Sequence, residues 1–389
     1  MNSFTYRYPV TVYFGEKAVE KNLPAELSRV GKNVMLAYGG GSVKRNGVYD
    51  ALMELLTAAG KNVTEFTGIM SNPTYAKVQE GARLARENEI DFILAVGGGS
   101  VIDCCKVVSA QAKTDSDLWE LETVQHGGPT AFIPMGAVVT AFGTGAEMNN
   151  GAVITNEEKK VKGPLWGAFY DFAILDPAYT MTMPMTQVIS GAFDALSHCM
   201  ETYMGAPRET NLSDEINEAC QRNIIRNLRA TIKNPQDIMA RSELVWAAAM
   251  GENGILKIGK VTDFQAHMLE HQLGAYTDCN HGQGLAVIHP VLYRHMLPEA
   301  VPQFARLAVN VWGVDPAGKT EAELANAFLD ALASFIQEIG LPTTFVEMGI
   351  PVDTDYKAVA DSTVLTGGCC KKFTKDELLT VLKSADKEA

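Results

Sequence analysis

The stretch DFILAVGGGSVID, from Asp91 to Asp103, is the clearest indication of the fold class of this chain. Its apolar run from Asp91 to Val96 is typical of a strand buried on both faces, and three glycines follow it directly. From Val101 to Ala112 the pattern predicts a helix. A buried strand that leads into a helix through a glycine turn is the repeating unit of a parallel sheet, so this stretch predicts an α/β fold.

The same alternation extends on both sides of this stretch. Strands are predicted at Asn33–Ala37, Asn62–Phe66, around Phe132 and Ile133, and at Asp171–Leu175, and helices at Val48–Ala59 and Tyr75–Asn88. Repeated strand–helix units of this length indicate a parallel, Rossmann-like sheet with helices on both faces.

Beyond Pro177 the pattern becomes helical. Helical periodicity is found at Gln187–Tyr203, Asn211–Thr231, Ser242–Ile255, Phe264–Leu273 and Leu324–Ile339. The sequence therefore predicts two domains, an α/β domain over residues 1–180 and an all-helical domain over residues 181–389.

Composition narrows the range of partners. The 389 residues carry a formal net charge of -13, which disfavours binding to nucleic acid or to anionic membranes. No apolar stretch approaches the ~20 residues of a membrane-spanning helix, and the N-terminus lacks the features of a signal peptide. The 7 cysteines include neighbours at Cys104-Cys105 and Cys369-Cys370 and follow no disulfide spacing, so we expect reduced thiols and a cytoplasmic location.

Two glycine-rich loops are candidate phosphate sites. In the first, Gly97 and Gly98 would let backbone N–H groups approach a phosphate, and Ser100 is expected to cap the following helix and to donate a hydrogen bond to the phosphate. Ile102 occupies the last position of a G-x-G-x-x-G pattern, so this is not the usual dinucleotide fingerprint. A tight turn without a ligand is the alternative interpretation.

The second loop contains Gly39, Gly40 and Ser42. An acidic residue at the end of such a strand commonly binds the ribose 2′-hydroxyl of NAD. No acidic residue lies between Val34 and Lys44, which favours NADP over NAD.

The histidines are concentrated in a few places. Asp194 and His198 are four residues apart on one predicted helix, His267 and His271 repeat that spacing on another, and His281 lies in a loop-like segment. Imidazole and carboxylate groups from two helices and a loop can converge on one divalent cation. The pattern H-x-x-E-H that ends at His271 also fits a metallopeptidase, with the intervening glutamate as general base.

These motifs together resemble the iron-containing alcohol dehydrogenase family over nearly the whole chain, and most closely its butanol dehydrogenase branch. The resemblance is carried by GGGSVID (97–103), TAFGTGAEMN (140–149), LDP (175–177), GAFDALSHCMETY (191–203), DFQAHMLEH (263–271) and NHG (280–282). It implies an N-terminal dinucleotide-binding domain and an all-α C-terminal domain, an architecture similar to that of dehydroquinate synthase, with the active site in the cleft between them.

The resemblance also implies roles for individual residues. It implies a divalent metal, Fe(II) or Zn(II), held by Asp194, His198, His267 and His281, with His271 as a catalytic residue near the nicotinamide rather than a ligand. It implies that the cofactor contacts Asn72, Gly97, Gly98, Ser100, Asp103, Thr140, Thr144 and Lys162. Gly39, Gly40 and Ser42 of the second loop, and Asn149, complete the predicted set of cofactor residues. Gly40 falls about where NAD-preferring members carry an acid, which agrees with the NADP prediction.

The implied activity is hydride transfer between NAD(P) and a small, short-chain aliphatic alcohol or aldehyde. A polyol dehydrogenase of the same family and a non-redox lyase of related fold remain alternatives, beside the metallopeptidase. A homodimer is the default expectation for an enzyme of this kind.

Overall fold

The computed structural model describes residues 2–368 and 370–386, so Cys369 lies outside the described part. The chain forms two compact units. One runs from Arg7 to Pro184, and the other comprises the residues from Met185 onward together with the first residues up to Tyr6. The N-terminal segment joins the second unit through the amide of Asn2, which donates to the carbonyl of Gly259 at 3.2 Å.

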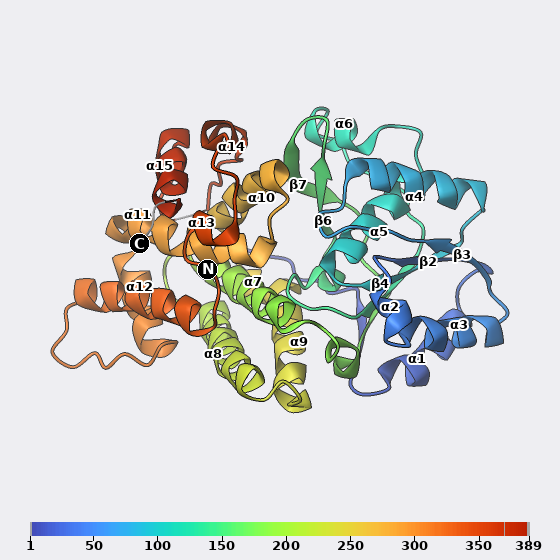
Figure 1. Cartoon of the computed structure of the whole chain (residues 1–389), viewed down its shortest axis with the longest axis horizontal. Helices are drawn as coiled ribbons and strands as arrows, with labels where there is room; N and C mark the ends of the chain where they lie inside the picture. The colour runs from blue at the N-terminus through green and yellow to red at the C-terminus, as the bar shows by residue number, and fades with distance from the viewer. Residues whose placement is uncertain (1, 369, 387–389) are drawn as a thin grey trace. The chain divides into compact units, whose positions relative to one another are not determined.

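The first unit is built on a six-stranded sheet in which all paired strands are parallel (Figure 1). In the order in which they pair, its strands are β1 (Thr11–Phe14), β8 (Phe172–Leu175), β5 (Met135–Val139), β4 (Phe92–Gly97), β2 (Asn33–Tyr38) and β3 (Asn62–Phe66). This confirms the predicted parallel sheet. The strand around Phe132 and Ile133 was wrong in its position, because β5 begins two residues after Ile133.

Helices cover both faces of this sheet (Figure 1). One face carries α1 (Ala18–Leu27), α2 (Ser42–Arg45) and α3 (Val48–Ala58), and the other carries α4 (Tyr75–Glu87) and α5 (Gly99–Gln111). Leu36, Leu94 and Ile174 point toward the first set, and their neighbours along each strand point the opposite way. A central strand buried on both faces needs an unbroken apolar sequence, which is why DFILAV has no polar alternation.

A hairpin that the sequence analysis missed follows β5. Its strands are β6 (Gly151–Asn156) and β7 (Val161–Trp166), and they pair antiparallel. The interior of β7 contains Gly163-Pro164, a dipeptide that normally argues against a strand. The hairpin packs on α4 and α5, and the amide of Thr155 donates to the carbonyl of Pro73 at 2.9 Å.

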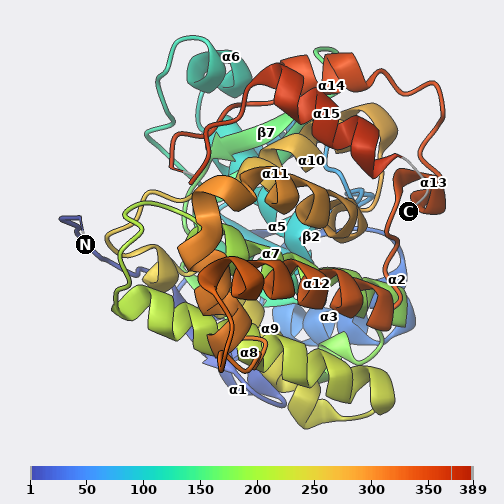
Figure 2. The same ribbon diagram turned by 90° about the vertical axis from the view of Figure 1, so that its left-hand side faces the viewer.

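The described residues of the second unit form helices joined by loops and no strand, apart from an isolated antiparallel bridge between Ala206 and Val261 (Figure 2). Its longer helices are α7 (Met185–Tyr203), α8 (Leu212–Lys233), α9 (Ile238–Glu252), α10 (Gln265–Thr277), α11 (His281–Asn310) and α12 (Glu321–Glu338), followed by α13 (Phe345–Met348), α14 (Tyr356–Ser362) and α15 (Lys375–Ala385). α8 packs beside α9, and α11 packs along α12 and against α7 and α10. Among the described residues, no helix has the length and apolarity needed to cross a membrane.

Helix α11 differs most from expectation. Its 30 residues include Pro290, Pro298 and Pro302, which usually mark helix ends. The Asn280 side chain caps the helix by accepting a hydrogen bond from the amide of Gln283 at 3.1 Å. His281 is therefore the first residue of a helix, and the prediction that it lies in a loop was wrong.

Candidate metal and cofactor sites

One side of α7 carries three buried polar groups. Asp194, His198 and Glu201 are spaced i, i+4 and i+7, which brings them onto one face of the helix. Buried groups of this kind are costly unless they meet partners, so this face must lie against other polar groups. The partners come from the N-terminal parts of α10 and α11.

The start of α10 is fixed by Glu201. Its Oε1 atom accepts a hydrogen bond from the amide of Ala266 at 2.6 Å, and its Oε2 atom accepts from both the amide and the Nδ1 atom of His267. A carboxylate at a helix N-terminus is favoured by the unpaired amides and the helix dipole. This arrangement directs the Nε2 atom of His267 back toward α7.

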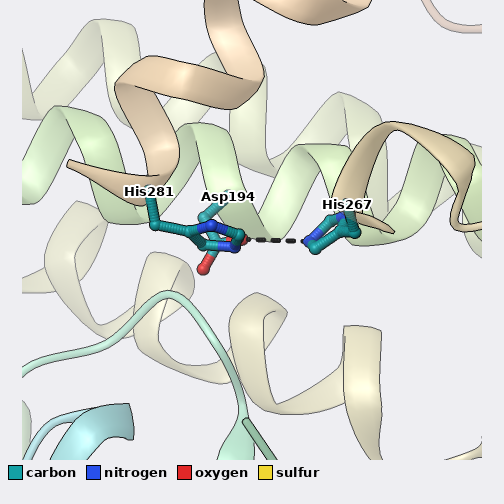
Figure 3. Close-up of side chains that lie close together, drawn as sticks. All are labelled: Asp194, His267 and His281. Carbon is teal, nitrogen blue, oxygen red and sulfur yellow. Dashed lines mark ion pairs between the residues drawn. The ribbon is translucent and has the colours of Figure 1, made fainter. Parts of the chain in front are cut away.

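Three imidazoles converge on one carboxylate oxygen. The Oδ1 atom of Asp194 lies 3.4 Å from Nε2 of His281, 3.5 Å from Nε2 of His267 and 3.7 Å from Nε2 of His198. Figure 3 shows the side chains of Asp194, His267 and His281 pointing toward one another from three helices. The four residues that the family resemblance implied as metal ligands thus face one another.

These groups fit a divalent cation. The Oδ1 atom of Asp194 and the Nε2 atom of His267 are buried and make no hydrogen bond of normal geometry to any described residue. Such orphaned polar atoms are rare in protein interiors and call for an explanation. The donor atoms of Asp194, His267 and His281 all lie within 4.8 Å of one another. His198 is outside this group but faces the same carboxylate oxygen, and with it the site would offer three imidazoles and one carboxylate, a donor set suited to Zn(II) or Fe(II).

The charged groups at this centre shift the pKa values of its residues in the direction opposite to the effect of burial. Burial alone would lower the pKa of His267, but the negative charges of Glu201 and Asp194 outweigh it and raise the pKa to about 10. Burial likewise opposes the charged form of His281, yet Glu270 and Asp194 raise its pKa. The pKa of Asp194 is held well below its usual value by the facing imidazoles, despite burial.

His271 lies at the edge of this centre. Its ring is stacked on that of His281 with the centroids 5.4 Å apart, and it lies 5.9 Å from the ring of His267. Glu270, the residue before it, is fully buried, and its Oε2 atom bonds to Nδ1 of His281. Glu270 is therefore committed to a histidine, which removes the general-base role that the metallopeptidase alternative required.

The glycine loops lie at one edge of the sheet in the first unit. From β2 the chain proceeds to β3 on one side, and β4 then returns to the other side of β2. Such a reversal of strand order is where parallel α/β sheets bind ligands, beyond the carboxyl ends of the strands. The Gly39–Gly41 loop follows β2 and the Gly97–Gly98 turn follows β4, so the two predicted loops flank this point.

Close packing explains why the second turn needs a third glycine. A Cβ atom on Gly99 would lie 2.2 Å from Oγ1 of Thr144, so no larger residue fits beside that threonine. The carbonyl of Gly97 accepts a hydrogen bond from the amide of Thr140 at 2.9 Å, which joins the loops after β4 and β5. Three of the predicted cofactor residues therefore share one local structure.

The expected cap at Ser100 was wrong. Gly98 is the N-cap of α5 and Ser100 is already inside the first turn. The hydroxyl of Ser100 donates to the carbonyl of Ser71 instead. A helix N-terminus with no side-chain cap leaves backbone amides available to an anion.

Other predicted cofactor residues make hydrogen bonds in or next to the β6–β7 hairpin. The Nζ atom of Lys162 donates to Oδ1 of Asn72 at 3.0 Å, which joins two residues 90 positions apart. Lys106, which the sequence analysis did not single out, is fully buried and donates to Oδ1 of Asn149 at 2.9 Å. The Oδ2 atom of Asp103 accepts from the amide of Val153 at 2.9 Å, so Asp103 and Asn149 both connect α5 to the hairpin.

A nucleotide-type sheet edge and a histidine-rich metal centre are the parts of a metal-dependent dehydrogenase. The sequence profile of the iron-containing alcohol dehydrogenases matches residues 9–177, and the profile described as Fe-containing alcohol dehydrogenase family, C-terminal, matches residues 188–386. The chain belongs to the iron-containing alcohol dehydrogenase family and is therefore an oxidoreductase.

Individual relatives agree with this assignment. The chain is 39% identical to the probable NADH-dependent butanol dehydrogenase 1 of Bacillus subtilis, over 99% of this chain and 100% of that protein. It is 33% identical to an NADPH-dependent aldehyde reductase of Escherichia coli, over 90% of each. The crystal structure of NADH-dependent butanol dehydrogenase A from Thermotoga maritima superposes with a TM-score of 0.93 at 31% identity, covering 100% of this chain and 99% of that one.

These relatives decide between the alternatives. A 1,3-propanediol dehydrogenase of Klebsiella pneumoniae is more distant, at 28% identity over 98% of each chain, so the butanol-type interpretation is favoured over the polyol-type one. The lyase and metallopeptidase alternatives are inconsistent with membership of this family.

Proposed function

We propose that this protein is an NAD(P)-dependent alcohol dehydrogenase, equally an aldehyde reductase, for short-chain aliphatic substrates of the butanol type. One divalent ion is held by Asp194, His198, His267 and His281. The convergence of three imidazole Nε2 atoms within 3.4–3.7 Å of Asp194 Oδ1 is the observation that carries this proposal. The relatives named for butanol and aldehyde chemistry support the substrate class.

When bound, the ion would supply Lewis acidity at the substrate oxygen, and the nicotinamide would supply or accept the hydride. The backbone amides at the start of α5, with Gly97, Gly98 and Ser100, bind the pyrophosphate, and Gly39, Gly40 and Ser42 bind the adenosine ribose. Further cofactor contacts are made by Asn72, Thr140, Thr144 and Lys162, while Asp103 and Asn149 hold the hairpin that carries Lys162.

The reaction also requires a proton to enter or leave the substrate oxygen. We assign this role to His271, because imidazole transfers protons near neutral pH and its ring stacks on that of the ligand His281.

The deciding experiment measures oxidation of NADPH and of NADH with butanal, using protein stripped of metal and then restored anaerobically with Fe(II) or Zn(II). Turnover that depends on the added metal, and that is lost in the Asp194→Ala variant, is the expected result. No turnover with either cofactor and either metal would overturn the proposal. A comparison of Fe(II) with Zn(II) in the same assay identifies the working metal.

We also propose that the enzyme is a cytoplasmic homodimer. The net charge of -13 and the described cysteines, none of which forms a disulfide with another described residue, support a reducing, aqueous compartment. Light scattering on the purified chain tests the oligomeric state, and a monomeric mass would contradict this part of the proposal.

A further inference from the structure

Each of two histidines in the metal centre has a carboxylate on the nitrogen that faces away from the centre. The Oε2 atom of Glu201 bonds to Nδ1 of His267, and the Oε2 atom of Glu270 bonds to Nδ1 of His281. Both glutamates are fully buried. The Nε2 atoms of the same two rings face Asp194.

We propose that Glu201 and Glu270 are positioning residues that hold His267 and His281 in the one tautomer and ring orientation able to bind the metal. This inference rests on the proposed metal site, and it adds two residues that support the ligands without contacting the metal. A proton kept on Nδ1 by a carboxylate leaves the lone pair of Nε2 for the cation. The carboxylate also increases the basicity of the ring as a ligand.

The connections follow the order of the helices. Glu201 belongs to α7 and orients a histidine of α10, whereas Glu270 belongs to α10 and orients the first residue of α11. A third bond returns from α11 to α7, between Nε2 of His289 and Oγ of Ser197 at 2.5 Å. The three helices that supply the donors are thus tied in pairs by histidine side chains.

Both carboxylates use their second oxygen atom as well. In Glu201 the Oε1 atom accepts from the amide of Ala266 at 2.6 Å. In Glu270 the Oε1 atom lies 3.7 Å from Sγ of Cys279, the residue that precedes the cap of α11. With both oxygens held, neither carboxylate can rotate away from its histidine without losing a second contact.

Gly284 provides independent support for Glu270. A Cβ atom at Gly284 would lie 2.8 Å from Cγ of Glu270 and 3.1 Å from its Oε1 atom. Alanine is the better helix former at this interior position of α11, yet only glycine leaves room for the glutamate. The space for the carboxylate is therefore built into the neighbouring helix.

His198 differs from the other two histidines. Its Nδ1 atom is buried and makes no hydrogen bond within the described part of the chain. Packing holds its ring instead, because it stacks on the ring of His267 with the centroids 4.5 Å apart and contacts Phe264 at 5.9 Å. Among the described residues, a carboxylate on Nδ1 is therefore found for His267 of α10 and His281 of α11, but not for His198 of α7.

The test compares the zinc affinities of metal-stripped, full-length variants by competition with a chromophoric chelator. Glu201→Gln and Glu270→Gln keep the shape of the side chain and remove its charge, and we expect each to weaken zinc binding roughly 10- to 100-fold. Gly284→Ala, which alters no donor and no carboxylate, should also weaken it. The Co(II) absorption spectrum of each variant should change in position or intensity, a signature that a purely structural role would not move.

Glu218→Gln is the matched control. Glu218 is a buried carboxylate of the same unit, and it accepts hydrogen bonds from Tyr203 at 2.9 Å, Arg306 at 2.5 Å and Asn310 at 3.1 Å, not from a histidine. It should lose stability without losing zinc affinity. Thermal unfolding of the metal-free proteins identifies any variant that fails to fold, and the Glu270 and Gly284 variants still test the inference if the Glu201 variant unfolds.

Wild-type zinc affinity in a folded glutamine variant would overturn the role of that carboxylate. This outcome is distinct from failure of the proposed function, in which the unmodified protein itself would bind no zinc, or Asp194→Ala would bind it as tightly as the unmodified protein.

Discussion

The Nε2 atom of His267 lies 3.5 Å from the Oδ1 atom of Asp194, and within residues 2–368 and 370–386 neither buried atom makes a hydrogen bond of normal geometry. Two buried polar atoms this close need a positive charge between them, which is a proton in the metal-free site or a cation in the metal-bound one. A cation between the two atoms satisfies both at once, which gives the first two predictions.

Asp194→Ala should abolish stable metal binding. Asp194 supplies the anionic donor of the set, and all three imidazoles face the same oxygen atom of its side chain. Since loss of an outer-shell partner alone costs about 10- to 100-fold in affinity, loss of a direct ligand should cost at least about 100-fold. Metal content after desalting measures this, and a variant that retains one equivalent of metal would remove Asp194 from the ligand set.

Metal binding should release protons and tighten as the pH rises. The metal-free site keeps His267 protonated up to its pKa of about 10, and the pKa of His281 is raised as well, whereas a cation needs the deprotonated Nε2 atoms. Calorimetry of zinc binding in buffers of different ionisation enthalpy counts the protons. Binding that is independent of pH between neutrality and about pH 10 would contradict the assignment of His267.

The metal-free protein should show the opposite trend in stability. A histidine whose pKa is raised on folding stabilises the folded state fully below its unfolded pKa of 6.5, and this contribution is lost as the pH rises to about 10. The free energy of unfolding of the metal-free protein should therefore fall across this range, as urea titration can measure. His267→Gln should reduce the decline.

Much of this site was predictable because it depends on local spacing. Asp194 with His198, and His267 with His271, are four residues apart, and helix geometry alone brings each pair to one face. The strand Asn62–Phe66 was predicted with its observed bounds because its flanking turns are explicit in the sequence. Local patterns of this kind survive in the folded chain.

What the sequence did not reveal depends on contacts between distant residues. In the sequence, Glu201 cannot be distinguished from any other polar residue of an amphipathic helix. Its role depends on the contact of its side chain with the start of α10, which is distant in sequence. Helix α11 was missed because its prolines read as helix ends, although packing against α7, α10 and α12 maintains the helix around them. The hairpin that carries Lys162 was missed for a similar reason, since Pro164 disfavours a strand that tertiary contacts nevertheless stabilise.

His271→Ala should lower turnover and leave the metal bound. Its ring stacks on the ring of His281, but His281 already has Asp194 on one nitrogen and Glu270 on the other. The rate should fall roughly 100- to 10,000-fold, the usual contribution of a general acid–base group, and the dependence of the rate on pH should flatten. If the variant loses its metal, His271 is a ligand, a role its closeness to Glu270 and His281 would also allow.

Glu147→Gln should stabilise the protein at neutral and alkaline pH. Burial raises the pKa of Glu147 to about 7 from an unfolded value of 4.5, so the folded state holds a proton that the unfolded state releases. The resulting penalty grows between these two pH values and reaches on the order of 3 kcal/mol above them. Urea unfolding at acidic and alkaline pH measures it, with the exposed Glu157→Gln as control; equal stability of the variant and the unmodified protein above about pH 8 would contradict the prediction.

The choice between NADPH and NADH should depend on an acid that is distant in sequence. The loop directly after β2 contains no acidic residue, which favours NADPH. Glu65 of β3, however, lies 3.3 Å from Nζ of Lys44 and accepts a hydrogen bond from Tyr49 at 2.7 Å. Lys44 is in the short helix that follows the glycine loop, where its charge would attract a 2′-phosphate, and Glu65 offsets that charge. Relatives at 34–39% identity are named as NADH-dependent, so the opposing effects of Lys44 and Glu65 on cofactor choice need to be measured.

Glu65→Gln should therefore shift the ratio of kcat/KM toward NADPH by roughly 1.4- to five-fold, because an exposed ion pair contributes about 0.2–1 kcal/mol. Gly40→Asp should shift it toward NADH, since a Cβ atom at Gly40 meets nothing within 4 Å and the new carboxylate would repel a 2′-phosphate. The effect of Glu65→Gln should weaken at high salt, as expected for an exposed charge. If neither substitution changes the ratio, the adenosine ribose does not lie at the Gly39–Gly41 loop, and the cofactor must be bound in another register along the sheet edge.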